Sequence, residues 1–295
     1  LSVLHKINID NPYQLLNLIH KAQSDDPFCM ALASSTKKKN NSNFFFRDNL
    51  LYRKSNNILR KELIVLPDIL MPSIIHTFHE QLQHPSNKLL NLTLSAIFYN
   101  RKLRKFVAEY TNSCAICQIA GIKLKQPYKI GSKRSFNATA PNQQIFLDLI
   151  PMPPSHNYNS ILSIMDGFSN YFTAFPLNNP SSGKVIELIQ MYFNSQGIVK
   201  LLVSDSDSIF DLAFRQLKRL YPISYDFSLP FRHQANRIEG SIKSFKERLM
   251  KALLTLENKQ YWPQILPYVL NAMNDTLLTD YKVTRRELHF NRNLI

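Results

Sequence analysis

The sequence predicts a mixed α/β sheet covered by helices, preceded by a small helical metal-binding unit. Two observations predict the sheet. Three strand-like runs follow one another between residues 145 and 177, and helix-like and strand-like runs then alternate. The third observation lies upstream, where His79 and His84 are followed by Cys114 and Cys117, a residue set typical of structural zinc sites.

These patterns divide the chain into four segments. We expect an N-terminal extension with short strands at 1–69, a helical zinc-binding domain at 70–122, a basic linker at 123–144 and the α/β core at 145–295. The chain begins with Leu1 and has no basic-then-apolar leader, so we expect a processed piece or a fragment of a longer protein.

Composition favours a soluble protein that binds a polyanion. Hydrophobic residues make up 44% of 295 residues, and no apolar run is long enough to span a membrane, so we expect no membrane contact. The net charge is +15. Residues 1–135 hold 20 Lys and Arg against 8 Asp and Glu, and residues 136–295 hold 16 against 13. This excess in the first half indicates nucleic acid as the partner.

The first half reads as strands followed by helices. Thr36–Asn43 is polar and basic, which predicts a loop or linker. The segment after it predicts short strands with a turn at Ser55–Asn57. From Leu70 to about Val107 the apolar residues recur at helical spacing.

In the second half, strands are predicted at 145–151, 160–166 and 171–177, the last two joined by a hairpin turn. A helix capped by Ser181 or Ser182, a strand ending at Asp205 and a helix over residues 209–220 follow. The last predicted helix is amphipathic, with apolar positions spaced by three or four residues: Ile238, Ile242, Phe245, Leu249, Leu253 and Leu256.

The two histidines and two cysteines are spaced H-x4-H-x29-C-x2-C. Two imidazoles and two thiolates complete a tetrahedral Zn²⁺ site, and in small units such binding supplies folding free energy on the order of 10 kcal/mol. His76 lies one helical turn before His79 and could compete as a ligand. The alternatives are a redox-active Cys pair and ordinary surface histidines.

Three carboxylates could form a second metal site. Asp148 interrupts an apolar strand, Asp205 ends another strand, and Glu239 lies at the start of the amphipathic helix. A carboxylate inside an apolar strand is costly to bury unless it is paired or binds a metal. If they meet at one sheet edge, the three can hold two Mg²⁺ or Mn²⁺ ions roughly 3.5–4 Å apart for in-line attack on phosphate. Individually, each residue also suits a strand edge, a turn or a helix start.

With these residues identified, the chain resembles the integrase region of a gypsy-type long-terminal-repeat retrotransposon polyprotein, which is similar to retroviral integrases. The resemblance covers nearly the whole chain and rests on several motifs in order: "HKAQSDDPF", "DNLLYRK", "HEQLQHPSNK" with "CAICQ", "FLDLI", "LLVSD", "NRIEGSIKSFKERL" and "LNAMNDTLLTDYKVTRRELHFNRN". It implies a ribonuclease-H-like core with a mixed five-stranded sheet and flanking helices.

By resemblance the activity is that of a polynucleotidyl transferase and endonuclease: 3′-end processing of element DNA, then strand transfer into target DNA. Asp148, Asp205 and Glu239 match the catalytic metal ligands of the family. Lys243 and Lys246 share a helix face with Glu239 and match DNA-contacting positions. The implied partners are DNA and further copies of the chain. The implied location is the nucleus, after a cytoplasmic particle or polyprotein stage.

Other residues receive structural interpretations. Asp166 matches a hairpin aspartate of the family that is not a metal ligand, and Cys29 and Trp262 are read as core or surface residues.

The sequence departs from the family where glycines are usual. Asp207 stands two positions after Asp205, Asn236 three positions before Glu239, and Ser86 two positions after His84. Lost glycines matter where the backbone needs positive φ. They support a second hypothesis, a degenerate or domesticated, catalytically inactive protein that binds DNA or oligomerises through its zinc domain. They also leave open whether Asp207 disturbs Asp205.

Overall fold

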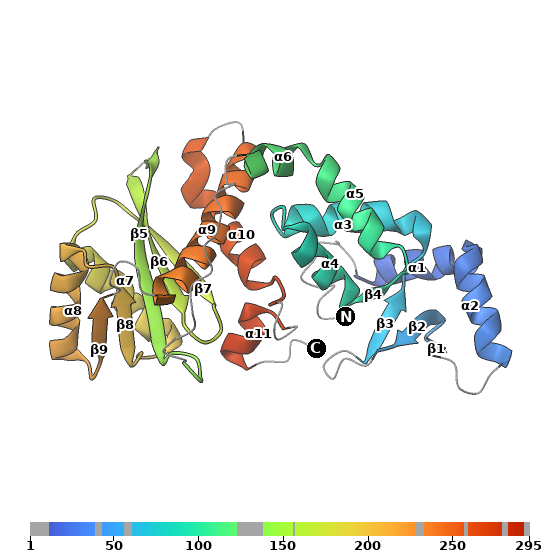
Figure 1. The fold of residues 1–295 in the computed structure, drawn as a ribbon, viewed down its shortest axis with the longest axis horizontal. Coiled ribbons are helices and arrows are strands. Elements are labelled where there is room, and N and C mark those ends of the chain that lie inside the picture. The colour runs from blue at the N-terminus through green and yellow to red at the C-terminus, as the bar shows by residue number, and fades with distance from the viewer. Residues whose placement is uncertain are drawn as a thin grey trace. The chain divides into compact units, whose positions relative to one another are not determined.

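The computed structural model describes residues 12–38, 43–55, 61–122, 138–155, 157–227, 233–256, 259–278 and 283–291. At residues 12–14, 35–38, 121–122, 233–239 and 259 it describes the backbone but not the side chains. The chain divides into two compact units, the first formed mainly by residues up to Gly121 and the second mainly by residues 122–275 (Figure 1).

The first unit contains a four-stranded sheet in the order β1-β2-β3-β4. The first three strands are antiparallel neighbours, and β4 joins β3 in parallel. The strands are β1 (Phe44–Arg47), β2 (Leu50–Lys54), β3 (Glu62–Val65) and β4 (Phe98–Tyr99). The predicted short strands are therefore present, whereas residues 56–57 of the predicted turn lie outside the described residues.

Six α-helices are described in the first unit: α1 (Pro12–Asp25), α2 (Pro27–Lys38), α3 (Met71–Gln81), α4 (Asn87–Ser95), α5 (Leu103–Ser113) and α6 (Ala115–Ile122). The helical spacing from Leu70 to Val107 corresponds to α3, α4 and α5, with β4 inserted between α4 and α5. The sequence did not predict α1 and α2. The expected linker at Thr36–Asn43 was wrong at its start, because α2 continues to Lys38.

One hydrophobic core joins the N-terminal segment to the zinc-binding helices. Leu15 and Ile19 of α1 and Leu50 of β2 pack in the same cluster as Phe78 of α3 and Leu90 of α4. Gln23 ties α1 to the sheet, since its amide donates to the carbonyls of Leu51 and Val65 and accepts from the Leu51 amide. The core therefore includes residues on both sides of the boundary that was predicted between residues 69 and 70.

The second unit contains a five-stranded mixed sheet in the order β7-β6-β5-β8-β9. The neighbours β7, β6 and β5 are antiparallel, and β8 and β9 continue in parallel with β5. The strands are β5 (Gln144–Ser155), β6 (Tyr158–Asp166), β7 (Phe172–Leu177), β8 (Leu201–Ser204) and β9 (Ser224–Phe227). The helices are α7 (Ser182–Gln196), α8 (Ser208–Leu220), α9 (His233–Leu254), α10 (Trp262–Asn274) and α11 (Arg285–Phe290).

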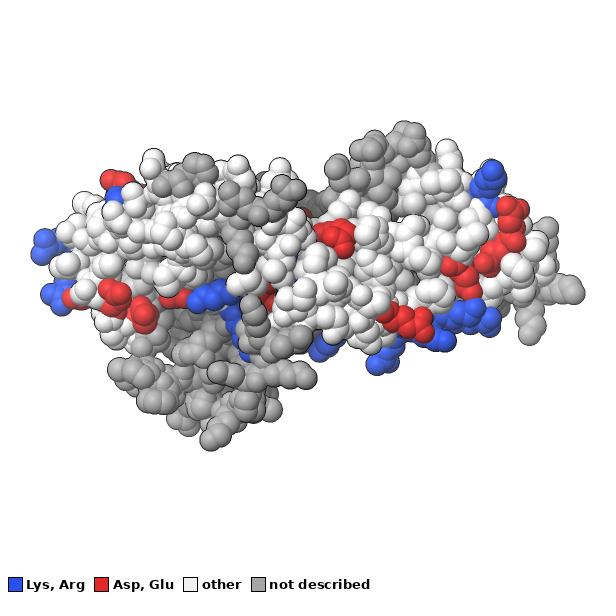
Figure 2. Space-filling view, turned by 90° about the horizontal axis from the view of Figure 1, so that it is seen from above, with Lys and Arg blue, Asp and Glu red and all other residues white. Residues whose placement is uncertain are grey.

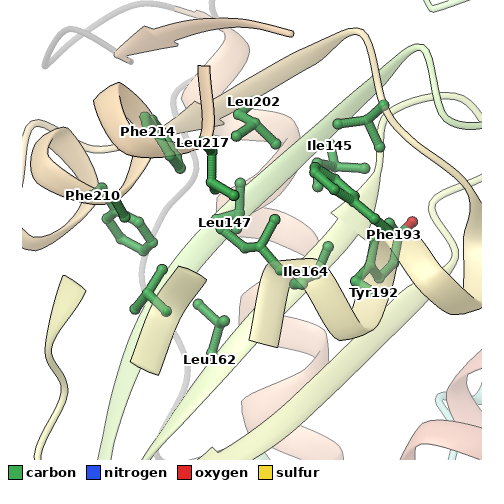
Figure 3. Close-up of a cluster of buried hydrophobic side chains, with 14 of the residues drawn as sticks. Ile145, Leu147, Leu162, Ile164, Tyr192, Phe193, Leu202, Phe210, Phe214 and Leu217 are labelled. Atoms are coloured by element: carbon green, nitrogen blue, oxygen red, sulfur yellow. The ribbon is translucent and has the colours of Figure 1, made fainter. Parts of the chain in front are cut away.

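Helices cover both faces of this sheet (Figure 1). Ile145 and Leu147 of β5 pack with α7 and α8 on one face, where Phe214 and Leu217 are buried (Figure 3). Phe146 points to the opposite face and packs with α9 and α10. Alternate residues of one strand thus enter two cores, as the pleat of a strand requires. The ribonuclease-H-like fold class predicted from the sequence is confirmed.

The predicted hairpin, the Ser181-capped helix and the helix after Asp205 are also present. The predicted start of the last long helix was wrong, because α9 begins at His233. Asn236 and Glu239 therefore lie within the helix, and their side chains are outside the described residues.

Asp166 is a structural residue, as expected. It is buried and accepts hydrogen bonds from the amides of Phe168, Ser169 and Asn142 and from the Ser169 hydroxyl. Burial alone would raise the pKa of Asp166, but hydrogen bonds from His289, Ser169 and Asn142 outweigh it and hold the pKa below its usual range. The carboxylate thereby fixes the turn between β6 and β7.

Cys29 and Trp262, which were predicted to be core or surface residues, are both buried. Trp262 is fully buried, and its indole N–H donates to the Pro153 carbonyl. Cys29 is buried beside Leu51 and Val65, and its burial raises the pKa of the thiol to about 12. A thiol held protonated in this way is not suited to bind a metal.

Candidate metal centres

His79, His84, Cys114 and Cys117 come together in the first unit. One ligand atom from each lies within 4.8 Å of the other three. His79 Nε2 is 2.9 Å from His84 Nδ1 and 3.4 Å from Cys117 Sγ, and Cys114 Sγ is 3.4 Å from His84 Nδ1. Zn–N and Zn–S bonds of usual length in a tetrahedron separate such atoms by about 3.3–3.6 Å. Both nitrogen–sulfur distances match this range, and the two nitrogens lie closer together than a bound ion would hold them. The four side chains therefore fit one zinc ion.

Local backbone geometry brings the two histidines together. Helix α3 ends at Gln81, and Gln83 and His84 both have φ of 54°. The His84 amide donates to the His79 carbonyl at 2.8 Å, so the chain folds back onto the helix end. Left-handed backbone is uncommon for residues other than glycine and asparagine, and such strain often accompanies a functional site. Two fully buried imidazoles held in this way are consistent with a bound metal.

The cysteines come from the junction of two helices. Cys114 ends α5 with an extended backbone, and Cys117 lies in the first turn of α6. The Gln118 amide donates to the Cys114 carbonyl and begins the new helix. The short turn places both sulfurs on the side that faces the histidines.

His76 is not part of this cluster. It is exposed on α3, and its Nδ1 lies 2.6 Å from the Tyr110 hydroxyl. The same tyrosine ring contacts His79, with ring centroids 5.2 Å apart. His76 therefore binds a side chain next to the site instead of competing as a ligand.

The second unit brings Asp148 and Asp205 close together. The parallel register pairs Phe146 with Val203, and both side chains belong to the core on the α9 face. Asp148 lies two residues after Phe146 and so on the α9 face of β5. Asp205 directly follows the last residue of β8 and is close enough for its charge to act on Asp148. The Glu239 side chain lies outside the described residues.

The folded chain disfavours the charged form of Asp148 and of Asp205. Burial raises the pKa of Asp148, the Asp205 charge raises it further, and Lys246 opposes these effects. Burial also raises the pKa of Asp205, with an added contribution from the Asp207 charge. A half-buried carboxylate beside an exposed one whose charge raises its pKa is suited to bind a divalent cation, which would compensate both charges.

Lys243 and Lys246 lie on α9, as expected. Lys246 is exposed, Lys243 is half-buried, and the Lys246 charge acts on Asp148. The buried face of the helix is formed by Ile242, Phe245 and Leu249 against the sheet. Lys246 therefore stands near Asp148, and neither lysine belongs to the hydrophobic core.

Asp207 caps α8. Its carboxylate accepts a hydrogen bond from the Ile209 amide at 2.8 Å, and its φ is −78°. Ser86 likewise caps α4 with φ of −63°. Neither position needs the positive φ that glycine permits, so these two replacements cause no backbone strain. Aspartate and serine are preferred residues at such caps.

The role of Asp207 can be separated by two substitutions. Asp207→Asn keeps a capping side chain but removes the negative charge, so we expect the pKa of Asp205 to fall and the free energy of unfolding to change little. Asp207→Ala should lower the same pKa and also cost about 1 kcal/mol of stability. Carboxyl NMR titration and denaturant unfolding measure the two quantities. The control Asp211→Asn should leave the pKa of Asp205 unchanged. If the pKa of Asp205 is also unchanged in both Asp207 variants, this account of Asp207 is wrong.

The basic excess is not concentrated on the face seen in Figure 2, where Lys and Arg lie beside Asp and Glu. The residues of the basic linker from 123 to 137 are outside the described residues. Among the described helices, we find none long and apolar enough to cross a membrane.

A comparison with known protein families agrees with the zinc site. Residues 66–123 match the family described as the integrase zinc binding domain. The chain is 26% identical over 231 residues to the Pro-Pol polyprotein of Simian foamy virus type 3, covering 77% of this chain and 20% of that protein. It is 24% identical over 253 residues to the Transposon Tf2-3 polyprotein of Schizosaccharomyces pombe, covering 82% and 18%. The chain thus spans about a fifth of the length of these relatives.

Among solved structures, the chain is similar to one described as a simian T-cell lymphotropic virus intasome in complex with PP2A regulatory subunit B56 gamma. The TM-score is 0.48 at 18% identity, over 73% of this chain and 72% of the other. The family match and the polyprotein relatives support an integrase region of a long-terminal-repeat retroelement, as the sequence motifs indicated. The same match, with the four clustered side chains, supports a structural Zn²⁺ ion.

Sequence reasoning missed one residue near the zinc site. Glu80 Oε2 lies 3.3 Å from His84 Nε2, the ring nitrogen that does not face the other three ligands. The available signal was its position beside His79 and four residues before His84.

Proposed function

We propose that this integrase region trims the 3′ ends of its element's DNA and joins them to target DNA. The observation that carries the proposal is the proximity of Asp148 on β5 to Asp205 at the end of β8, since the Asp205 charge raises the pKa of Asp148. The zinc-binding family match upstream and the polyprotein relatives support the same function.

Asp148, Asp205 and Glu239 would hold two Mg²⁺ or Mn²⁺ ions. The first two fit this role, because both are oxygen ligands whose mutual repulsion a cation would relieve. When bound, such ions lower the pKa of the attacking oxygen and stabilise the charge on the leaving oxygen. Glu239 is part of α9, whose residues Ile242 and Phe245 pack on the same sheet face as Phe146 of β5.

Two in-line displacements at phosphorus would make up the reaction. In the first, a water oxygen attacks a phosphodiester near the element's end, a P–O bond breaks and a 3′ hydroxyl is released. In the second, the oxygen of that hydroxyl attacks a target phosphodiester and forms a new P–O bond, while the target's own 3′ oxygen leaves and takes up a proton. The protein's task is to position the groups and compensate the developing charge.

Lys246 and Lys243 would contact the DNA backbone beside the reacting phosphate. The exposed Lys246 already acts electrostatically on Asp148, so a phosphate bound there would lie near both groups. We further propose that the chain acts as a homo-multimer on DNA, and in the nucleus when it integrates.

A strand-transfer assay with the full chain, its own terminal DNA and Mn²⁺ or Mg²⁺ tests the proposal. We expect metal-dependent joining of the 3′ ends to a target duplex. Binding of that DNA without any trimming or joining would instead favour a catalytically inactive DNA-binding protein. The structure gives that alternative less support than the sequence did, because Asp207 and Ser86 occupy ordinary backbone conformations.

A further inference from the structure

The carboxylate that lies next to the second ring nitrogen of His84 has a direct bearing on the zinc site. His84 Nδ1 faces the ligand cluster, at 2.9 Å from His79 Nε2 and 3.4 Å from Cys114 Sγ. Its other nitrogen, Nε2, lies 3.3 Å from Glu80 Oε2. We infer that Glu80 is a positioning residue, which keeps the proton on His84 Nε2 and so presents Nδ1 as the metal-binding atom.

Because His84 is buried, its contact with Glu80 affects which ring nitrogen carries the proton. The His84 side chain is 2% exposed, so an N–H on its ring has little access to water and needs a partner within the protein. The Glu80 side chain is 39% exposed, and its Oε2 lies at the edge of the site as an acceptor for this N–H. A neutral imidazole carries one proton, and an acceptor at Nε2 leaves the lone pair on Nδ1 for the ion.

The two histidines therefore offer different nitrogens, Nε2 from His79 and Nδ1 from His84. The left-handed backbone at Gln83 and His84 brings the His84 ring to the end of α3, where the Glu80 carboxylate can reach it. If His84 bound the metal through Nε2, its ring would have to turn over and lose the contact with Glu80. A carboxylate that orients a metal-bound histidine commonly affects metal affinity by about 10–100-fold.

Zinc competition against a chromophoric chelator measures the effect in the full chain. We expect Glu80→Ala to bind zinc about 10–100-fold more weakly than the wild type. Glu80→Gln should recover much of the affinity, because its amide oxygen still accepts from Nε2–H. The matched control is Glu109→Ala, which removes a carboxylate from the exposed side of α5, where Glu109 pairs with Lys105 at 3.8 Å. It should leave zinc affinity unchanged.

A second measurement uses the wild-type chain and does not depend on the variants folding. Long-range ¹H–¹⁵N spectra of the zinc-loaded protein report which nitrogen of His84 carries the proton. We expect a protonated Nε2 and a metal-bound Nδ1.

The inference depends on zinc binding and not on catalysis by the second unit. A protonated Nδ1, an unchanged affinity in Glu80→Ala, or an equal loss in Glu80→Gln and Glu80→Ala would overturn the role of Glu80 alone. A wild-type chain that binds no zinc would overturn the zinc assignment as well. None of these results depends on whether the chain joins DNA.

Discussion

Asp148→Asn is expected to abolish 3′-end processing and strand transfer while the protein stays folded. An amide of the same shape fills the same space in β5, but it lacks the charge that a divalent ion requires. We expect joining of DNA ends to fall by at least about a thousandfold, equivalent to about 4 kcal/mol of transition-state stabilisation. Asp205→Asn should have a similar effect, because the two carboxylates are neighbours.

The stability of the same variant distinguishes a catalytic residue from a structural one. Burial raises the pKa of Asp148, so the folded state disfavours its charge and gains from a neutral side chain. We therefore expect the melting temperature of Asp148→Asn to equal or exceed that of the wild type. DNA binding measured by fluorescence anisotropy should persist.

Asp211→Asn is the matched control for this substitution. Asp211 lies on α8, where it pairs with Arg215, and α8 packs on the sheet face opposite α9. Its replacement should leave end joining intact. Full joining by Asp148→Asn or Asp205→Asn would refute the assignment of these carboxylates.

Removal of zinc is expected to destabilise the first unit selectively. In small zinc peptides the ion contributes on the order of 10 kcal/mol. Here the zinc helices share a core with α1 and the sheet, so we expect a large loss of stability and not complete unfolding. Without the ion, the buried ring nitrogens of His79 and His84 that face the cluster would lose their bonds to the metal, while the two left-handed residues Gln83 and His84 would keep their backbone strain. Calorimetry with and without a chelator, together with metal analysis, measures the change.

The cysteines provide an internal control for that experiment. Cys114→Ser should lose zinc and lower the melting temperature of the first unit, whereas Cys29→Ala should keep one zinc per chain. Cys29 is buried away from the cluster and its thiol pKa is raised to about 12. One tightly bound zinc in Cys114→Ser would contradict the four-ligand site.

Much of the second unit follows from periodicity alone. The apolar spacing of α9 and the runs in β5, β6 and β7 identify these elements, because each buries a continuous stripe or face. The shortest elements escape such reasoning. Strand β9 alternates exposed and half-buried residues, and β4 has only two residues, which pair with β3 through the tertiary fold.

The N-terminal helices were missed for a different reason. Along α1 the buried positions are Leu15, Ile19 and Gln23, one turn apart. Gln23 is polar, and its burial is compensated by hydrogen bonds to the sheet. The apolar stripe of α1 therefore has only two positions, which is too short to predict a helix. The burial of Gln23 depends on partners in β2 and β3, which no local pattern reveals.

In the candidate sites, too, the sequence predicted some residues and not the contacts that depend on the tertiary fold. Motif spacing and resemblance pointed to the zinc ligands and to Asp148 and Asp205, which the fold brings together in pairs and clusters. The contacts around them could not be predicted. Glu80 meets His84 only because two left-handed residues turn the chain back, and Asp207 meets the Ile209 amide only because a helix starts there.

The continuous core of the first unit has a practical consequence for dissecting the protein. The zinc-binding family match begins at residue 66, yet Leu15, Ile19 and Leu50 fill the same interior as the helices that carry the ligands. A fragment cut at that boundary would leave an apolar face of α3 and α4 open to water and prone to self-association. The smallest autonomous zinc-binding piece of this chain therefore begins no later than α1.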